Sequence, residues 1–232
     1  MADEEKRRWR GPKPGEKAAP RGLETRVKAS SKHSESSRRW IERQVNDPYV
    51  QRAKAEGWRA RAAFKLIEID DQFKLIGKGA RVLDLGAAPG GWAQVCVKRG
   101  ARAVVGVDLL PIDPLPGAVF LQMDFLAPEA PEALLAALGG KPDLVLSDMA
   151  ANTTGHAKTD QIKTGALAEA AADFALSVLA PGGAFVTKAF QGGLDADVLA
   201  RLKKGFASVR HVKPKASRAE SAEVYVVAMG KR

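Results

Sequence analysis

The stretch ARVLDLGAAPGGWAQVCVKRG, residues 80–100, decides the fold of this chain. It begins with a short apolar run that ends in an acid and a glycine, Asp84 and Gly86, and its last ten residues show the apolar spacing of a helix. The glycines between these halves allow a tight turn and a close approach of the backbone to a ligand. We therefore predict a strand, a glycine-rich loop and a helix, which is the opening unit of a parallel α/β sheet.

The alternation of strand and helix continues toward the carboxyl end. We predict strands over residues 101–110, 118–124, 143–148 and 184–190, and helices over 128–140, 160–180 and about 194–204. The last two strands, 206–212 and 223–230, follow each other without a helix, which indicates an antiparallel edge pair. The predicted fold class is α/β, a mostly parallel seven-stranded sheet with an antiparallel edge strand and helices on both faces.

The segments before this unit differ from it in composition. Residues 58–76 have a mostly helical apolar period and place Lys65 on an amphipathic helix, and a short helix is expected to begin near Trp40. Residues 1–38 are rich in Lys, Arg, Ser, Gly and Pro and have almost no apolar pattern, which is typical of disorder. We predict a disordered basic tail over 1–38 and a single domain over 39–232.

The positive charge is concentrated at the amino end. The formal net charge is +10, from 37 Lys and Arg against 27 Asp and Glu. Residues 1–62 contain 17 basic and 9 acidic side chains, a net of +8, which leaves +2 for the remaining 170 residues. A basic arm on a nearly neutral body is typical of a protein that binds a polyanion, either nucleic acid or an anionic membrane surface.

Several classes of protein are excluded by the residues that are scarce. One cysteine, Cys96, excludes a disulfide framework and a cysteine-based zinc site, and three scattered histidines argue against a metal site, so we predict none. No apolar run approaches the roughly 20 residues of a membrane span, and the amino end lacks the apolar core of a secretory signal. We expect a cytoplasmic monomer without a membrane partner.

Acidic residues stand at the ends of the first three predicted strands, where open α/β sheets bind ligands. Asp108 follows Gly86 by 22 residues, where a carboxylate accepts both ribose hydroxyls of an adenosine, and Asp124 is placed to reach an adenine amino group. The loop GAAPGG departs from the G-x-G-x-x-G pattern of dinucleotide sites, and Asp84 would repel a pyrophosphate but can pair with a cationic amino group. S-adenosylmethionine, which is cationic at its sulfonium, fits this pocket best.

A lysine interrupts an apolar strand. Lys188 lies in the segment AFVTKAF, and because a buried unpaired charge costs several kcal/mol, it requires a partner. Asp148, at the end of the neighbouring predicted strand, is the expected partner. Taken alone, the pair of Lys188 and Asp148 can also be interpreted as a structural salt bridge. Lys65, taken alone, can also be interpreted as a solvated surface charge.

Five segments resemble the FtsJ family, also called RrmJ or RlmE, the bacterial 23S rRNA uridine-2′-O-methyltransferases. They are RARAAFKLIEID, DLGAAPGGW, SDMAANTTG, VTKAFQGG and SRAESAEVYVV, and the similarity covers about residues 38–230. The resemblance implies a Rossmann-like class I methyltransferase fold with S-adenosylmethionine as donor. It also implies the family's catalytic tetrad, which falls on Lys65, Asp148, Lys188 and Glu223, and cofactor contacts on Gly90, Trp92, Asp108, Asp124 and Asp148.

The resemblance further implies methyl transfer to the ribose 2′-hydroxyl of a uridine in 23S rRNA, within the large ribosomal subunit. Lys188 is the candidate general base or, as a cation, stabilises the developing alkoxide, and Asp148 would hold it in line. The alternatives are a 2′-O-methyltransferase of tRNA or another RNA, and a non-catalytic ribosome-assembly factor with the same fold. Two residues depart from the family pattern: Ala151, where the family usually has proline, and Glu220, where it usually has a basic or small residue.

Overall fold

The computed structural model describes residues 35–151, 157–190 and 194–232. The chain divides into two compact units, residues 1–47 and 48–232, and helix α1 (Glu35–Asn46) belongs to the first. Most of the predicted tail, residues 1–34, lies outside the described residues. Residues 35–38, the last four of the predicted tail, are helical, so the expected helix start near Trp40 is wrong by about one turn. Helix formation is cooperative, which extends the helix back over the preceding serines.

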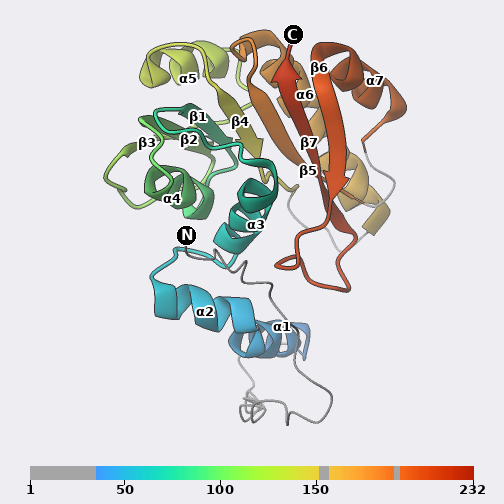
Figure 1. Ribbon diagram of the computed structural model, residues 1–232. Helices are drawn as coiled ribbons and strands as arrows, with labels where there is room; N and C mark the ends of the chain where they lie inside the picture. The colour runs from blue at the N-terminus through green and yellow to red at the C-terminus, as the bar shows by residue number, and fades with distance from the viewer. Residues whose placement is uncertain (1–34, 152–156, 191–193) are drawn as a thin grey trace, which may run out of the picture. The chain divides into compact units, whose positions relative to one another are not determined.

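The second unit is built on a sheet in the order β3-β2-β1-β4-β5-β7-β6 (Figure 1). The strands are β1 (Arg81–Leu85), β2 (Ala103–Asp108), β3 (Ala118–Gln122), β4 (Leu144–Ser147), β5 (Ala184–Phe190), β6 (Phe206–Val212) and β7 (Glu223–Lys231). The first five strands in this order are parallel, whereas β7 pairs antiparallel with both β5 and β6. The mostly parallel seven-stranded sheet is therefore confirmed, with β7 one place inside the edge strand β6.

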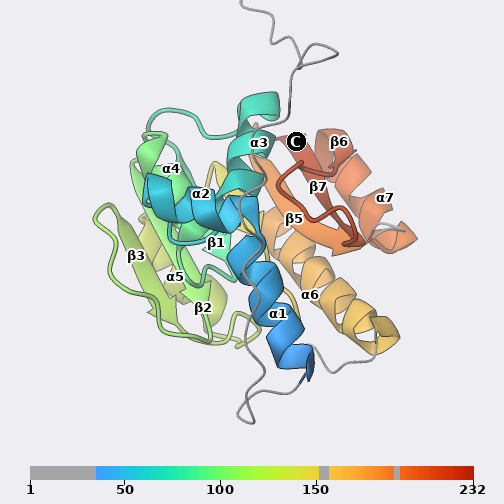
Figure 2. The same ribbon diagram turned by 90° about the horizontal axis from the view of Figure 1, so that it is seen from below.

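Helices cover both faces of this sheet, as predicted (Figures 1 and 2). On one face lie α3 (Ala63–Phe73) and α4 (Gly91–Lys98), and on the other lie α5 (Ala130–Leu138), α6 (Ala157–Val178) and α7 (Ala196–Gly205). Helix α2 (Pro48–Glu56) packs beside α3 through contacts of Ala53 with Phe64. In this Rossmann-like arrangement the carboxyl ends of the parallel strands β1, β2 and β4 lie at the same end of the sheet.

The alternation of side chains along each strand decides which residues face α3. Leu83 of β1 and Phe185 of β5 pack toward α5–α7, whereas Val82 and Val186 pack toward α3 and α4. Because successive side chains point to opposite faces, Lys188 lies on the same face as Val186. In the antiparallel register Lys188 lies opposite Tyr225. The sheet thus presents polar side chains of β5 and β7 to the helix that carries Lys65.

The packing of β2 against the glycine loop requires a glycine at position 106. A Cβ atom there would lie 2.8 Å from Ala87 Cβ and 2.8 Å from Phe120 Cδ1. We expect Gly106→Ala to lower the free energy of unfolding by about 1–3 kcal/mol, measured by urea denaturation. The control is Gly165→Ala on α6, where a Cβ meets no atom within 4 Å and should raise stability by about 0.5–1 kcal/mol. Equal effects of the two substitutions would contradict this packing.

Candidate active site

Four charged side chains that are far apart in the sequence meet where α3 faces the sheet. Lys65 Nζ lies 2.8 Å from Glu223 Oε1 and 3.8 Å from Asp148 Oδ2. Lys188 Nζ lies 3.2 Å from Asp148 Oδ1 and donates to the main-chain oxygen of Asp148 at 2.6 Å. The ion pair expected from the burial of Lys188 is confirmed, and all four residues of the predicted tetrad are brought together.

These groups are largely shielded from water, and their charges balance. Lys65 and Lys188 are each 8% exposed, and the two lysines face two acids, Asp148 and Glu223. Burial acts to raise the pKa of Asp148, but the charges of Lys188 and Lys65, together with hydrogen bonds from Tyr225 and Lys188, outweigh it and hold the pKa below its usual range. Asp148 is therefore a carboxylate that two cations share.

Tyr225 joins this group although the sequence reasoning did not single it out. Its side chain is fully buried, its hydroxyl accepts a hydrogen bond from Lys65 Nζ at 3.0 Å, and it donates one to Asp148 Oδ1 at 2.7 Å. Burial, and next the charges of Asp148 and Glu223, raise its pKa well above the usual value, so the hydroxyl keeps its proton. The signal that could have found it is the period of two in a strand, which puts Tyr225 on the same face as Glu223.

A further hydrogen bond holds Glu223. Ser217 Oγ, on the loop between β6 and β7, donates to Glu223 Oε1 at 2.8 Å. Ser217 is 6% exposed, so this contact is sheltered from water. Glu223 therefore receives hydrogen bonds from Lys65 on one side and from its own loop on the other.

A cavity of about 350 Å³ lies beside this group, at the carboxyl ends of β1, β2 and β4. Four predicted pocket residues line it: Gly86, Asp108, Asp124 and Asp148. Its remaining wall is largely apolar and includes Leu109, Leu110, Met123, Phe125, Leu126, Met149 and Leu167. Sequence reasoning missed this apolar wall, although most of its members adjoin the predicted acids in the chain. Asp148 belongs both to the cavity and to the ion pairs, so it connects the two.

Asp108 and Asp124, two of the three acids that line the cavity, are oriented by backbone N–H groups. Asp108 Oδ2 accepts from the Ala88 N–H at 2.9 Å, and Oδ1 accepts from the Leu110 N–H at 2.9 Å. Asp124 Oδ1 accepts from the Leu126 N–H at 2.9 Å. Each carboxylate oxygen has more than one acceptor site, so both acids retain capacity for a ligand.

Gly90 and Trp92, also predicted to contact the cofactor, do not line this cavity. Trp92 is 3% exposed, its indole N–H donates to Ala62 O at 2.9 Å, and its ring centroid lies 5.7 Å from that of Tyr225. Gly90 has φ 94°, and a Cβ there would lie 2.8 Å from Arg59 Nη1. In the structure these two residues hold the glycine loop and α4 against the segment before α3.

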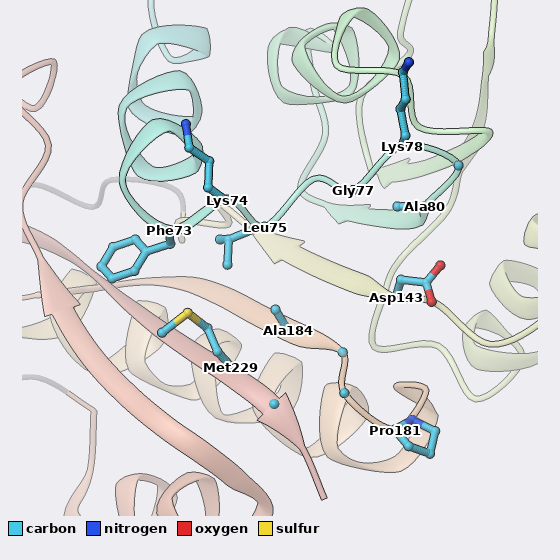
Figure 3. A pocket seen from close by; sticks show the side chains of 14 residues that line it. Phe73, Lys74, Leu75, Gly77, Lys78, Ala80, Asp143, Pro181, Ala184 and Met229 are labelled. Carbon is cyan, nitrogen blue, oxygen red and sulfur yellow. The ribbon is translucent and has the colours of Figure 1, made fainter. Parts of the chain in front are cut away.

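A larger cavity, of about 490 Å³, lies at the other end of the sheet (Figure 3). Its lining includes Ala80, Asp143 and Ala184, which stand at the amino ends of β1, β4 and β5. Lys74 and Lys78 also belong to its lining, but their side chains point away from Ala184 in Figure 3. None of the tetrad residues lines it, so the smaller cavity is the one that adjoins the charged group.

A family model described as FtsJ-like methyltransferase matches residues 58–231. The chain belongs to this family. A protein from Granulibacter bethesdensis named "Ribosomal RNA large subunit methyltransferase E" is 61% identical over 213 residues, 92% of this chain and 93% of that protein. A protein of the same name from Hyphomonas neptunium is 54% identical over the whole of both chains. A crystal structure of a ribosomal RNA methyltransferase from Plasmodium falciparum is 28% identical, with a TM-score of 0.66, and the match covers 75% of this chain and 98% of that one.

The structure of this FtsJ-like methyltransferase describes both positions, 151 and 220, at which the sequence predicts a departure from the family pattern. The Ala151 N–H donates to Thr164 Oγ1 at 3.2 Å, which ties the segment after β4 to α6. A proline at this position could not make that bond because it has no N–H. Glu220 is exposed on the loop between β6 and β7.

Two structural features of this methyltransferase bear on membranes and metals. Among the helices of the described ranges, none has the length and apolar character required to cross a membrane. Within the same residues, no group of three or more His, Cys, Asp and Glu side chains is placed to hold a metal ion.

Asp84 of the methyltransferase is the most isolated acid in the described residues near the cavity. It is 1% exposed, and neither carboxylate oxygen makes a hydrogen bond within the part of the chain that the structure describes. Burial, and next the charge of Asp148, raise its pKa from 3.8 to about 7, against a weaker attraction from the Ala93 backbone N–H. A buried acid without a partner is a group that a cationic ligand can satisfy.

The raised pKa makes stability depend on pH. Between about pH 4 and pH 7 the folded state binds more protons at Asp84 than the unfolded state does, so stability falls as pH rises through that window. We expect Asp84→Asn, which cannot ionise, to gain stability relative to the unsubstituted protein over that window, by at most about 4 kcal/mol. Urea denaturation of the ligand-free protein at several pH values measures this, with the exposed Asp113→Asn as control. A constant difference from pH 4 to pH 7 would contradict the isolation of Asp84.

Proposed function

We propose that this protein transfers a methyl group from S-adenosylmethionine to the ribose 2′-hydroxyl of a uridine in 23S rRNA of the large ribosomal subunit. The observation that carries the proposal is the buried set of two lysines and two acids beside a cavity with which it shares Asp148. The relatives named as large-subunit rRNA methyltransferases support the choice of substrate.

The acids in and behind the cavity suit the charge of S-adenosylmethionine. Asp108, which lines the cavity, retains acceptor capacity for the ribose hydroxyls. Asp84 does not line the cavity, but its unpaired oxygens lie buried behind it and suit a cationic amino group. A Cβ at Gly86 would lie 2.6 Å from Met149 Cγ, so only glycine lets the loop lie this close to Met149. When bound, S-adenosylmethionine supplies a methyl group activated by the positive charge on its sulfur.

In the proposed reaction, Lys188 first releases its ammonium proton to water and then, as the free amine, takes the proton of the 2′-hydroxyl. The proton moves from O2′ to Lys188 Nζ as the bond from O2′ to the methyl carbon forms and the bond from that carbon to sulfur breaks. Asp148 stabilises the resulting ammonium, since its carboxylate lies 3.2 Å from Lys188 Nζ. Lys65 and Glu223 orient the hydroxyl, and orientation alone can supply roughly 7–11 kcal/mol of the barrier.

The first test removes the base. Lys188→Ala is expected to abolish methyl transfer while the dissociation constant for S-adenosylmethionine stays nearly unchanged, because Lys188 does not line the cavity. Transfer of tritiated methyl groups measures activity, and calorimetric titration measures binding. Lys203→Ala, at an exposed position of α7, is the matched control. Residual activity above about a tenth of the control would remove Lys188 from the role of base.

The substrate for this assay is the large ribosomal subunit isolated from cells that lack the protein. Mapping of 2′-O-methyl groups by mass spectrometry should show one uridine of 23S rRNA that gains a methyl group with the active protein and not with Lys188→Ala. A methyl group gained only on tRNA would favour the tRNA alternative. An unchanged modification map in the deficient cells would favour an assembly factor without catalysis.

A second test concerns the donor site. Asp108→Ala should weaken the binding of S-adenosylmethionine by about 1–3 kcal/mol, because the ribose hydroxyls lose their acceptor. The change also leaves the Ala88 and Leu110 N–H groups without their bonds, so a thermal melt must accompany the titration. Asp113→Ala, five residues farther on and exposed, should leave affinity unchanged. An unaltered dissociation constant for Asp108→Ala would remove it from the donor site.

The basic amino end completes the proposal. Residues 1–62 carry a net charge of +8 and supply sequence-independent contacts to RNA phosphates, an affinity that falls steeply with salt. Residues 1–34 of this segment lie outside the described residues. We propose that the protein acts as a monomer, since all four tetrad residues and the cavity come from one chain. We propose the cytoplasm as its compartment because the proposed substrate is ribosomal RNA.

A further inference from the structure

We propose that Tyr225 is a positioning residue whose hydroxyl shares one oxygen of Asp148 with Lys188 and so keeps Lys188 available to the acceptor hydroxyl. The inference rests on the proposed function, in which Lys188 takes the proton. Tyr225 lies outside the Lys-Asp-Lys-Glu set, and its hydroxyl is the neutral group that connects the two ion pairs.

The geometry shows competition for a single oxygen. Asp148 Oδ1 receives the Tyr225 O–H at 2.7 Å and lies 3.2 Å from Lys188 Nζ. The hydroxyl proton is directed to Asp148 because Lys65 Nζ, which can only donate, occupies the other side of the Tyr225 oxygen at 3.0 Å. The tyrosine bond has the usual length of an O–H···O bond, whereas 3.2 Å is long for an ammonium–carboxylate hydrogen bond, so Lys188 has the weaker hold on this oxygen.

The tyrosine ring has little freedom to change this arrangement. Tyr225 is fully buried, its ring packs against Trp92, and its backbone lies opposite Lys188 in the β5–β7 ladder. The hydroxyl and the ammonium group are thus placed by neighbouring strands. A side chain fixed in this way can act through Asp148 on Lys188 without touching a substrate.

Removal of the hydroxyl would strengthen the pair of Lys188 with Asp148. A carboxylate oxygen that no longer shares its charge with a phenol attracts the remaining ammonium more strongly. A stronger ion pair would hold the ammonium group of Lys188 away from the acceptor hydroxyl, so methyl transfer would require a more basic solution. The other charged groups that face this site stay the same, namely Lys65 from α3, Asp84 from β1 and Glu223 from β7. The tyrosine itself keeps its proton through neutral pH because its pKa is raised well above the usual value.

The experiment compares pH profiles of kcat for Tyr225→Phe and the unsubstituted full-length protein on large ribosomal subunits that lack the methyl group. We expect the pH of half-maximal kcat to rise by about one unit and kcat at pH 7.5 to fall about tenfold. KM for S-adenosylmethionine should change less than about twofold, because Tyr225 does not line the cavity. Tyr49→Phe is the matched control, since the Tyr49 hydroxyl binds Glu68 Oε1 and not the tetrad.

A second measurement keeps the inference testable if Tyr225→Phe does not fold. The chain has two tyrosines, so biosynthetic 3-fluorotyrosine in the Tyr49→Phe background labels Tyr225 alone. Fluorination makes the phenol more acidic and a stronger donor to Asp148, so the profile should move to lower pH, opposite to Tyr225→Phe. Profiles that coincide, or that move in the same direction, would overturn the positioning role. If the unsubstituted protein methylates no 2′-hydroxyl, the proposed function fails instead, and this inference with it.

Discussion

The structure depends on one constraint: two buried ammonium groups must each be paired with a carboxylate. Lys65 and Lys188 are both almost inaccessible to water, and each would destabilise the fold by several kcal/mol without its acid. Glu223 and Asp148 meet this demand from other elements, so α3, β4, β5 and β7 must come together for any of them to be well placed. Electrical balance therefore joins parts of the chain that lie more than a hundred residues apart in sequence. The same balance yields a largely buried site in which ion pairs hold the four charged groups together.

Much of the fold could be predicted because its signals are local. The apolar runs, the glycine loop and the period of the helices each involve a few neighbouring residues, and they predicted the seven strands and the covered faces. The place of β7 between β5 and β6 is different, because strand order depends on contacts between distant segments. Element ends also moved: α6 begins at Ala157 and β3 ends at Gln122, two residues before Asp124. End positions depend on capping and packing, which a periodic pattern does not contain.

Most residues of the candidate site could be predicted from the sequence, but fewer of the hydrogen bonds and ion pairs that join them could be. The pairing of Lys188 with Asp148 followed from the cost of a buried charge, and the wider tetrad followed from the resemblance to a family. The period of two in β7 could have placed Tyr225 on the face of Glu223, but its hydrogen bond to Asp148 could not be predicted, because it depends on the register that sets Lys188 opposite Tyr225. The sequence also could not predict that Asp84 lacks hydrogen bonds, since this depends on the distances from its buried carboxylate to the surrounding donors. Trp92 shows the converse, a motif residue whose side chain serves packing in this structure.

The position of β7 has a consequence for how the protein matures on the ribosome that makes it. Within the described residues, those that line the cavity beside the tetrad lie between positions 86 and 167, whereas Glu223 and Tyr225 belong to the last strand. Chains begin to fold during synthesis, from the amino end. The residues of the cavity are therefore all synthesised before β7, while Lys65 lacks its nearest acid until that strand inserts between β5 and β6. The order of translation thus separates the two parts of the site in time, and the ion pairs of the tetrad are completed last.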